Sequence, residues 1–329
     1  MFKALLLTRE GGEFAARLTD LDESQLPEGE VDIAVDYSTV NYKDALAVTN
    51  RGAIVRQWPM VPGIDLAGRV TASRDPAWQP GDAVVVTGWG LGETRWGGLA
   101  QRARLPANLL LRLPAAFDTR QAMAIGTAGF TAALCVTALQ RHGLQPGQGE
   151  VLVTGAAGGV GSIAVALLGS LGYRVVASTG RPQEAEYLTA LGAAEVIDRQ
   201  ALAQPGGKPL QSERWAGVVD TVGSHTLANA CAQVRWFGAV AACGLAQGAD
   251  FPGTVMPFIL RGVTLYGVNS VMTPQDQRQA AWELLARHLD ADRLARMTVA
   301  IGLRDVIDWS PKVLAGQVRG RTVVDVRQA

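Results

Sequence analysis

Three glycines, Gly155, Gly158 and Gly161, recur at intervals of three residues between two apolar runs, and residues 156–161 read A-x-G-x-x-G. Small residues at these positions suit a tight turn from strand to helix, over which a pyrophosphate can approach the backbone. A second apolar strand follows the first after about 20 residues, as this motif requires. A glycine-rich turn that only packs is the alternative. The spacing predicts a dinucleotide site with contacts from Ala157, Gly158, Gly159 and Val160.

The second strand of this unit ends without the acidic residue that usually binds the ribose 2′-hydroxyl of NAD. Its end reads Ala-Ser-Thr-Gly-Arg over residues 177–181. A carboxylate there would repel a 2′-phosphate, whereas hydroxyls and a guanidinium would bind it. We therefore predict NADP(H), with contacts from Ser178, Thr179, Gly180 and Arg181; the alternative is that Arg181 is a solvated charge at a helix start.

Other strand ends at the same edge of the predicted sheet would meet the rest of the dinucleotide. They supply Arg199, residues 221–223, Leu245 and Ser270. For each of them, cofactor contact and a purely structural role both fit the sequence.

Two patterns of secondary structure must position these residues. Residues 1–122 contain short strands separated by Pro- and Gly-rich turns, which indicates a β-rich domain. From about residue 127, strands alternate with helices, including expected helices over 127–143, 182–192, 224–238 and 274–289. This alternation predicts an α/β fold with a doubly wound parallel sheet. The last stretch, 297–329, mixes strands with a short helix and is expected to return to the first domain.

Composition excludes several classes of protein. Lys plus Arg and Asp plus Glu are both 30, so no net charge attracts nucleic acid. The three cysteines are far apart and form no metal or disulfide pattern. The N-terminal apolar run is too short for a signal peptide, and glycines interrupt the most apolar segment well within the roughly 20 residues of a membrane span. We expect a cytoplasmic protein without membrane or nucleic-acid partners.

Several stretches resemble one known family. "VNYKDALAVT", "PMVPGIDLAG", "TGWGLGETRWGG" and "VMPFILRGV" are similar to the NADPH-dependent acryloyl-CoA reductases, which belong to the medium-chain dehydrogenase/reductase superfamily and are related to quinone oxidoreductases. The resemblance covers essentially the whole chain. It implies a GroES-like domain at 1–122 and 297–329, a Rossmann domain at 123–296, and a cytoplasmic homodimer that pairs through "TLYGVNS".

The resemblance also implies that no zinc is bound. The positions that hold catalytic zinc in metal-dependent relatives align here with Asn41, Ile64 and, more loosely, Ala124. None of these residues is a cysteine or histidine, and the four-cysteine structural lobe is missing.

Reduction of an activated C=C bond needs no Lewis acid. Hydride from the nicotinamide would reach the β-carbon of acryloyl-CoA, charge would build on the carbonyl oxygen, and the α-carbon would take a proton to give propanoyl-CoA. Tyr42 resembles the family's nicotinamide-side tyrosine and is the first candidate for cofactor or substrate contact. Asn41 and Asp65 are expected to line the cleft, and Asp65 could act as an acid only if burial raised its pKa.

The resemblance implies that Ile259 and Gly316 contact the cofactor. A CoA substrate carries phosphates, and the glycine-flanked or cleft-side context of four arginines makes them candidate phosphate ligands; the alternative is that they are solvated charges. They are Arg51, Arg56, Arg319 and Arg321. An NADPH:quinone oxidoreductase with the same fold is the alternative function. A catalytically silent NADPH-binding protein is a third.

Overall fold

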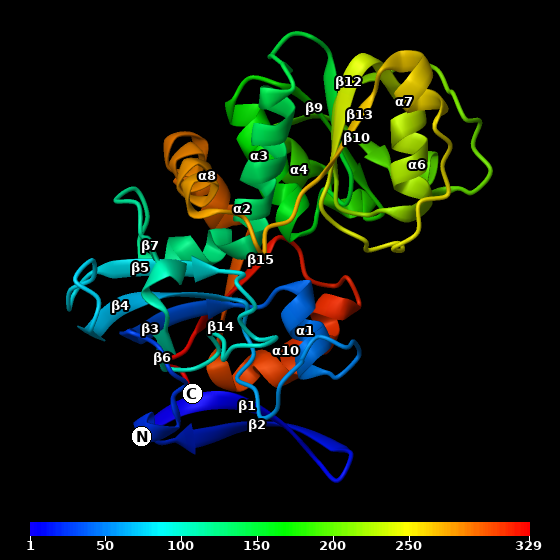
Figure 1. Ribbon diagram of the computed structural model, residues 1–329. Coiled ribbons are helices and arrows are strands. Elements are labelled where there is room, and N and C mark those ends of the chain that lie inside the picture. The colour runs from blue at the N-terminus through cyan, green and yellow to red at the C-terminus, as the bar shows by residue number, and fades with distance from the viewer. The chain divides into compact units, whose positions relative to one another are not determined.

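A computed structural model describes residues 1–329, apart from the side chain of Glu10. The contacts divide the chain into two compact units, shown in Figure 1. Unit 1 contains residues 1–127, 271–280 and 294–329, and unit 2 contains residues 128–270 and 281–293.

Unit 1 is built on β-structure. The hairpin of β1 (Phe2–Glu10) and β2 (Glu13–Leu21) is antiparallel, and a seven-stranded sheet has the order β14-β15-β3-β4-β5-β7, with β6 paired to β3. The strands are β3 (Val31–Thr39), β4 (Asp65–Ser73), β5 (Ala83–Thr87), β6 (Arg102–Leu105), β7 (Leu111–Arg112), β14 (Thr298–Gly302) and β15 (Arg321–Asp325). Helix α1 (Tyr42–Val48) packs against α10 (Val306–Leu314). The C-terminal strands β14 and β15 therefore belong to the same sheet as β3, β4 and β5.

Unit 2 contains a six-stranded sheet whose strands are all parallel, in the order β10-β9-β8-β11-β12-β13. The strands are β8 (Glu150–Val153), β9 (Arg174–Thr179), β10 (Ala193–Asp198), β11 (Trp215–Asp220), β12 (Val234–Ala242) and β13 (Thr264–Gly267). The helices are α3 (Gly159–Ser170), α4 (Ala185–Leu191), α5 (Gln200–Ala203), α6 (Ser224–Gln233) and α7 (Met256–Arg261). Helix α3 packs against β9 and α4 against β10, whereas α6 and α7 pack against β12; Figure 1 shows these helices around the sheet. The predicted α/β class with a Rossmann sheet and a GroES-like domain is confirmed.

Three helices contribute residues to both units: α2 (Thr119–Arg141), α8 (Gln275–His288) and α9 (Ala291–Arg296). Residues 271–280 join unit 1, whereas the predicted domains placed them in the second. The physical reason is Arg278, which donates to the carbonyl of Thr87 at 2.6 Å and to that of Val271 at 2.8 Å. Short 3-10 helices cover Glu23–Gln25, Ala107–Leu109, Pro182–Glu184 and Leu303–Asp305.

Two predicted helices have different bounds in the structure. The helix expected over 127–143 begins at Thr119, with a break at Gly126, whose φ is 50°. The helix expected over 224–238 ends at Gln233, because β12 begins at Val234, which pairs with Trp215 of β11. The register with β11 then shifts and the pairing resumes at Ala239, and between these points Phe237 has a φ of 56°. The predicted helix is therefore too long by the five residues 234–238.

Helix α2 is long and apolar enough to cross a membrane, judged by length and composition among the described residues. However, 78% of its apolar window is buried inside the protein, as in a core helix.

Candidate functional site

The glycine loop lies between β8 and the start of α3, and close contacts require glycine at two of its positions, Gly155 and Gly161. Gly155 has a φ of +58°, and a Cβ there would collide with the hydroxyl of Thr221. A Cβ at Gly161 would collide with the carbonyl oxygen of Gly155 and lie 2.6 Å from Cα of Ala156. Ser162 closes the loop, since its hydroxyl donates to the Ala156 carbonyl at 3.1 Å. The bare backbone at the helix start has the shape and polarity that a diphosphate needs.

The loop stands at the point where the order of the sheet reverses. The chain runs from β8 outward to β9 and β10, and then returns to place β11 on the other side of β8. Thr154 after β8 donates to Asp220 at 2.7 Å, and Asp220 also accepts from the N–H of Gly223 at 2.8 Å. Such a reversal opens a crevice at the carboxyl ends of the strands, where α/β proteins bind ligands.

Two arginines lie at the end of β9. The backbone N–H of Arg199 donates to the carbonyl of Thr179 at 2.9 Å, and a Cβ at Gly180 would lie 2.5 Å from Nε of Arg199. The Arg181 guanidinium donates to the carbonyl of Ala157 in the glycine loop at 2.8 Å. The absence of a side chain at Gly180 thus lets Arg199 lie beside the strand end, and two guanidinium groups can pair with one phosphate there.

The two hydroxyl residues predicted to bind the 2′-phosphate, Ser178 and Thr179, are less accessible than the arginines. Ser178 is 1% exposed and Thr179 is 5% exposed, and the Thr179 hydroxyl already accepts the N–H of Arg181 at 3.1 Å. In this structure they shape the strand end rather than present a free hydroxyl.

The other predicted cofactor residues lie at several places. Leu245 follows β12 and is 64% exposed, Ile259 lies on α7 and is 72% exposed, and Ser270 follows β13. Gly316 belongs to unit 1, in the exposed connection from α10 to β15, with a φ of +68°. Their contact with a cofactor stays a prediction.

Unit 1 contains a buried polar cluster that joins the start of α1, β4 and the break in α2. Both oxygens of Asp65 accept hydrogen bonds: the Thr127 hydroxyl donates to Oδ1, and the Asn41 amide donates to Oδ2 at 2.8 Å. The Thr127 N–H also donates to Oδ2, at 2.9 Å. Asp44 accepts from the N–H of Asn41 at 2.8 Å and from that of Ile64 at 2.9 Å.

Charge in this cluster is buried almost completely, with Asp65 at 0%, Asp44 at 1% and Arg321 at 3% exposure. Burial raises the pKa of Asp65, while hydrogen bonds from Thr127 and Asn41 and the charge of Arg321 oppose that rise. Burial and repulsion from Asp65 raise the pKa of Asp44 to about 7. Burial lowers the pKa of Arg321, and the nearby carboxylates oppose this.

This raised pKa predicts how pH affects stability. A carboxyl with a folded-state pKa of about 7 retains its proton after the unfolded chain has lost it, so its contribution to stability falls as pH rises from about 4 to about 7. Asp44→Asn removes this titration but turns an amide N–H toward the N–H of Ile64. We expect the variant to be clearly less stable than the native chain near pH 4, with the gap narrowing toward pH 8. Thermal unfolding of both proteins across this range tests it; a constant gap would contradict it.

The residues at the zinc positions do not fit zinc. Ile64 and Ala124 have no donor side chain, and the only side-chain oxygen of Asn41 accepts from Arg321 at 3.0 Å. Among the described residues, no group of three His, Cys, Asp or Glu side chains could hold a metal ion.

Other predicted residues are placed as follows. Tyr42 is the first residue of α1, with a side chain that is 52% exposed. Arg51, Arg56 and Arg319 are exposed. The interpretation of Arg321 as a CoA-phosphate ligand or a solvated charge is wrong, because its side chain is buried among Asn41, Thr39 and Ala124.

The sequence reasoning missed Asp44, Thr127 and Asp220. The signal for Asp220 was an acidic residue at the end of an otherwise apolar strand, and the signal for Asp44 was its place three residues after Asn41 at a helix start.

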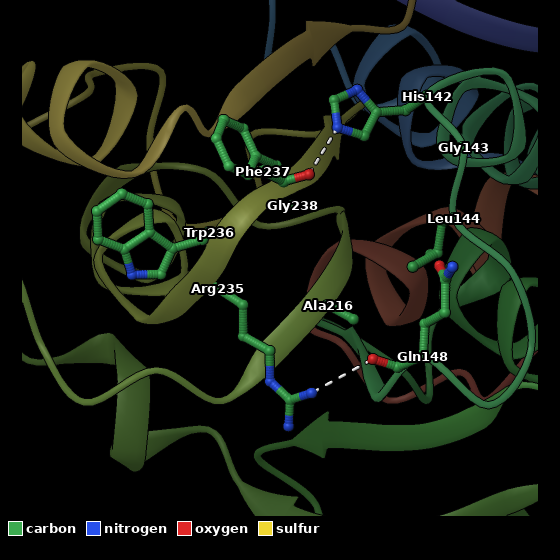
Figure 2. Close-up of a pocket in the computed structure, with 9 residues that line it drawn as sticks. All are labelled: His142, Gly143, Leu144, Gln148, Ala216, Arg235, Trp236, Phe237 and Gly238. Carbon is green, nitrogen blue, oxygen red and sulfur yellow. Dashed lines mark hydrogen bonds between the residues drawn. The ribbon is translucent and has the colours of Figure 1, made fainter.

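Unit 2 also contains a cavity of about 270 Å³, and Figure 2 shows the residues that line it. Its lining residues come from the amino-terminal parts of β11 and β12 and from the connection before β8. His142 contacts the carbonyl of Phe237 at 2.9 Å, and Arg235 donates to the carbonyl of Gln148 at 3.3 Å. The cavity is therefore at the amino-terminal ends of the parallel strands, whereas the predicted cofactor site is at their carboxyl ends.

Comparison with known proteins connects these sites to a family. The profile of the alcohol dehydrogenase GroES-like domain matches residues 27–115, and that of the zinc-binding dehydrogenases matches residues 159–287. The acrylyl-CoA reductase AcuI of Ruegeria pomeroyi is 52% identical over 99% of both chains, and the probable acrylyl-CoA reductase AcuI of Escherichia coli is 50% identical over 98% of this chain and 99% of its own. The crystal structure of the Salmonella enterica YhdH oxidoreductase in complex with NADP has a TM-score of 0.96 at 50% identity, covering 98% of this chain and 99% of its own.

Proposed function

The chain belongs to the acrylyl-CoA reductase family of medium-chain dehydrogenases, and from this premise we propose that it uses NADPH to reduce the C=C bond of acryloyl-CoA to propanoyl-CoA. It is thus an oxidoreductase that acts on CH–CH bonds. The observation that carries the proposal is the glycine-loop crevice with Arg181 and Arg199 at its ribose end, in a chain half identical to acrylyl-CoA reductases.

The cofactor is NADPH, which supplies the hydride when it is bound. The N–H groups in the first turn of α3 would hold the diphosphate, and Arg181 with Arg199 would neutralise the 2′-phosphate. Hydride addition to the β-carbon moves negative charge to the thioester oxygen, which needs a hydrogen-bond donor. We propose the hydroxyl of Tyr42 as a donor to substrate or cofactor.

The proton for the α-carbon comes from water or Tyr42 rather than from Asp65. Burial does raise the pKa of Asp65, which was the condition for an acid role. However, Asp65 is 0% exposed and both its oxygens accept hydrogen bonds from Asn41 and Thr127, so it has no access to a substrate. Its contacts fit a positioning role.

The NADPH:quinone oxidoreductase alternative and the silent protein are separated from this function by one assay. NADPH consumption is followed with acryloyl-CoA, crotonyl-CoA and a benzoquinone in parallel, with the thioester products identified by mass. We expect acryloyl-CoA to be turned over most efficiently. Fast turnover of the quinone alone would favour the alternative, and no turnover with any acceptor would favour a silent protein.

We also propose a homodimer that pairs through β13. This strand is at the edge of the six-stranded sheet, and an edge strand with unpaired N–H and C=O groups can pair with a second copy. Apolar side chains are exposed near this strand. Leu265 on β13 is 37% exposed. Phe237 is 73% exposed, and its ring lies against Gly262, two residues before β13. Pairing two copies would cover this surface.

We infer a cytoplasmic location without membrane or nucleic-acid partners. Its support is the three free cysteines, which suit a reducing compartment, and the net charge of zero. Arg51 and Arg56 are exposed on the segment after α1 and stay our candidates for the CoA phosphates.

A further inference from the structure

Two side chains connect the three positions that hold zinc in metal-dependent relatives. Arg321 donates to the side-chain oxygen of Asn41 at 3.0 Å and to the carbonyl of Ala124 at 2.8 Å. Asp44 accepts from the N–H of Ile64 and from the N–H of Asn41. The segments that a metal would join are therefore joined here by a guanidinium and a carboxylate, all within unit 1.

The amide of Asn41 has one orientation in this cluster. Its oxygen faces Arg321, while its nitrogen donates to Asp65 at 2.8 Å and to Asp44 at 3.0 Å. Reversing the amide would place its N–H groups against the guanidinium and its oxygen against the carboxyl oxygens of Asp65 and Asp44 that now accept from it. Since Asn41 is the N-cap of α1, this fixes the backbone immediately before Tyr42.

The cluster is also tightly packed. A Cβ at Gly126 would lie 2.7 Å from Nη2 of Arg321 and 2.8 Å from Oδ2 of Asp65, so the break in α2 packs directly on both groups. The third donor of Arg321 goes to the hydroxyl of Thr39 at 2.9 Å. Lysine could not replace this planar set of donors, because an ammonium on a flexible stem cannot reach three acceptors in fixed directions.

We propose that Arg321 and Asp65 are positioning residues, which orient Asn41 and, through it, hold Tyr42 for its contact with the cofactor. This proposal rests on the proposed function only in that Tyr42 contacts NADPH. It concerns residues that touch neither substrate nor cofactor themselves, because their side chains are enclosed by protein groups.

A double-mutant cycle between Arg321 and Tyr42 tests the proposal. NADPH affinity is measured by fluorescence for the native protein, Arg321→Lys, Tyr42→Phe and the double variant, together with kcat and KM for acryloyl-CoA. We expect Arg321→Lys to weaken NADPH binding or reduce kcat by about tenfold in the native background, within the range of couplings in one hydrogen-bond network. In the Tyr42→Phe background the same substitution should cost less than about twofold.

Arg278→Lys is the matched control. Arg278 is also an arginine of unit 1 that is 3% exposed, and it donates to the carbonyls of Thr87, Val271 and Thr273. Its charge also acts on Asp65, and lysine keeps that charge. Arg278→Lys should lower the melting temperature, as Arg321→Lys does. Its effects on NADPH affinity and kcat should be the same in the native background and in the Tyr42→Phe background. If the Arg321→Lys variant does not fold, Thr127→Val is used in its place, because this substitution removes the hydroxyl that donates to Asp65. Thr127→Ser keeps a hydroxyl and should give the native NADPH affinity and kcat.

Two results would overturn the positioning role. The first is that Tyr42→Phe adds its effect independently to that of Arg321→Lys, or of Thr127→Val. The second is that NADPH affinity and kcat fall only in proportion to the loss of stability. NADPH binding does not depend on the acyl substrate. A native protein that binds NADPH and shows the coupling but does not reduce acryloyl-CoA would therefore contradict the proposed function alone.

Discussion

Replacing Arg181 with alanine is expected to remove most of the preference for NADPH over NADH. Its guanidinium is held over the glycine loop by the carbonyl of Ala157, at the end of the strand where a 2′-phosphate would lie. A hydrogen bond to a charged group contributes about 1.5–3 kcal/mol, which corresponds to a loss of about 10- to 100-fold in NADPH affinity. NADH lacks the phosphate, so its affinity should change little. Dissociation constants for both cofactors, measured by fluorescence, test this.

Arg174→Ala is a suitable control, because Arg174 is at the opposite end of β9 and pairs with Glu150 at 3.1 Å. It removes the same charge from the start of the strand that Arg181 follows. Arg199→Ala should resemble Arg181→Ala, since Arg199 lies against Gly180. Equal affinities of the native protein for NADPH and NADH would show that neither arginine binds a 2′-phosphate.

A second large effect is expected at Gly161. A Cβ there meets the backbone at Gly155 and Ala156, which cannot rotate away as a side chain could. Gly161→Ala must therefore push the start of α3 from β8, and overpacking of this kind costs about 1–3 kcal/mol of stability. The displaced helix start should also weaken NADPH binding by about tenfold or more, because the diphosphate depends on its N–H groups.

Gly52→Ala provides the comparison for this substitution. Its Cβ would lie 3.5 Å from the side chain of Leu46, an ordinary contact, and it should leave both melting temperature and NADPH affinity near the native values. A Gly161→Ala variant that binds NADPH as the native protein does would mean that the glycine loop is not the diphosphate site.

Local signals in the sequence predicted the dinucleotide half well. The glycine spacing, the alternation of strands and helices and the missing acidic residue all lie within about 30 residues, which is the size of one βαβ unit. They predicted the parallel sheet of unit 2 and the place of Arg181 at the end of β9.

The buried cluster of unit 1 could not be predicted in this way. Arg321 and Asn41 are 280 positions apart, and Thr127 and Asp65 are 62 positions apart. Nothing local distinguishes Arg321 from the exposed arginines beside it, and for this reason it was assigned to the CoA phosphates. The strand start at Val234 was missed for a similar reason, because the pairing of Val234 with Trp215 of β11, 19 positions away, ends the helix there.

The most direct test of the central claim follows deuterium from NADPH into the product. The native protein is given acryloyl-CoA and NADPH that is deuterated on one face of nicotinamide C4, in ordinary water. We predict propanoyl-CoA with one deuterium at C3 from one of the two labelled forms of NADPH and none from the other, while the proton at C2 comes from solvent. NADPH consumption without deuterium at C3 of the thioester would contradict the assignment of this chain as an acryloyl-CoA reductase.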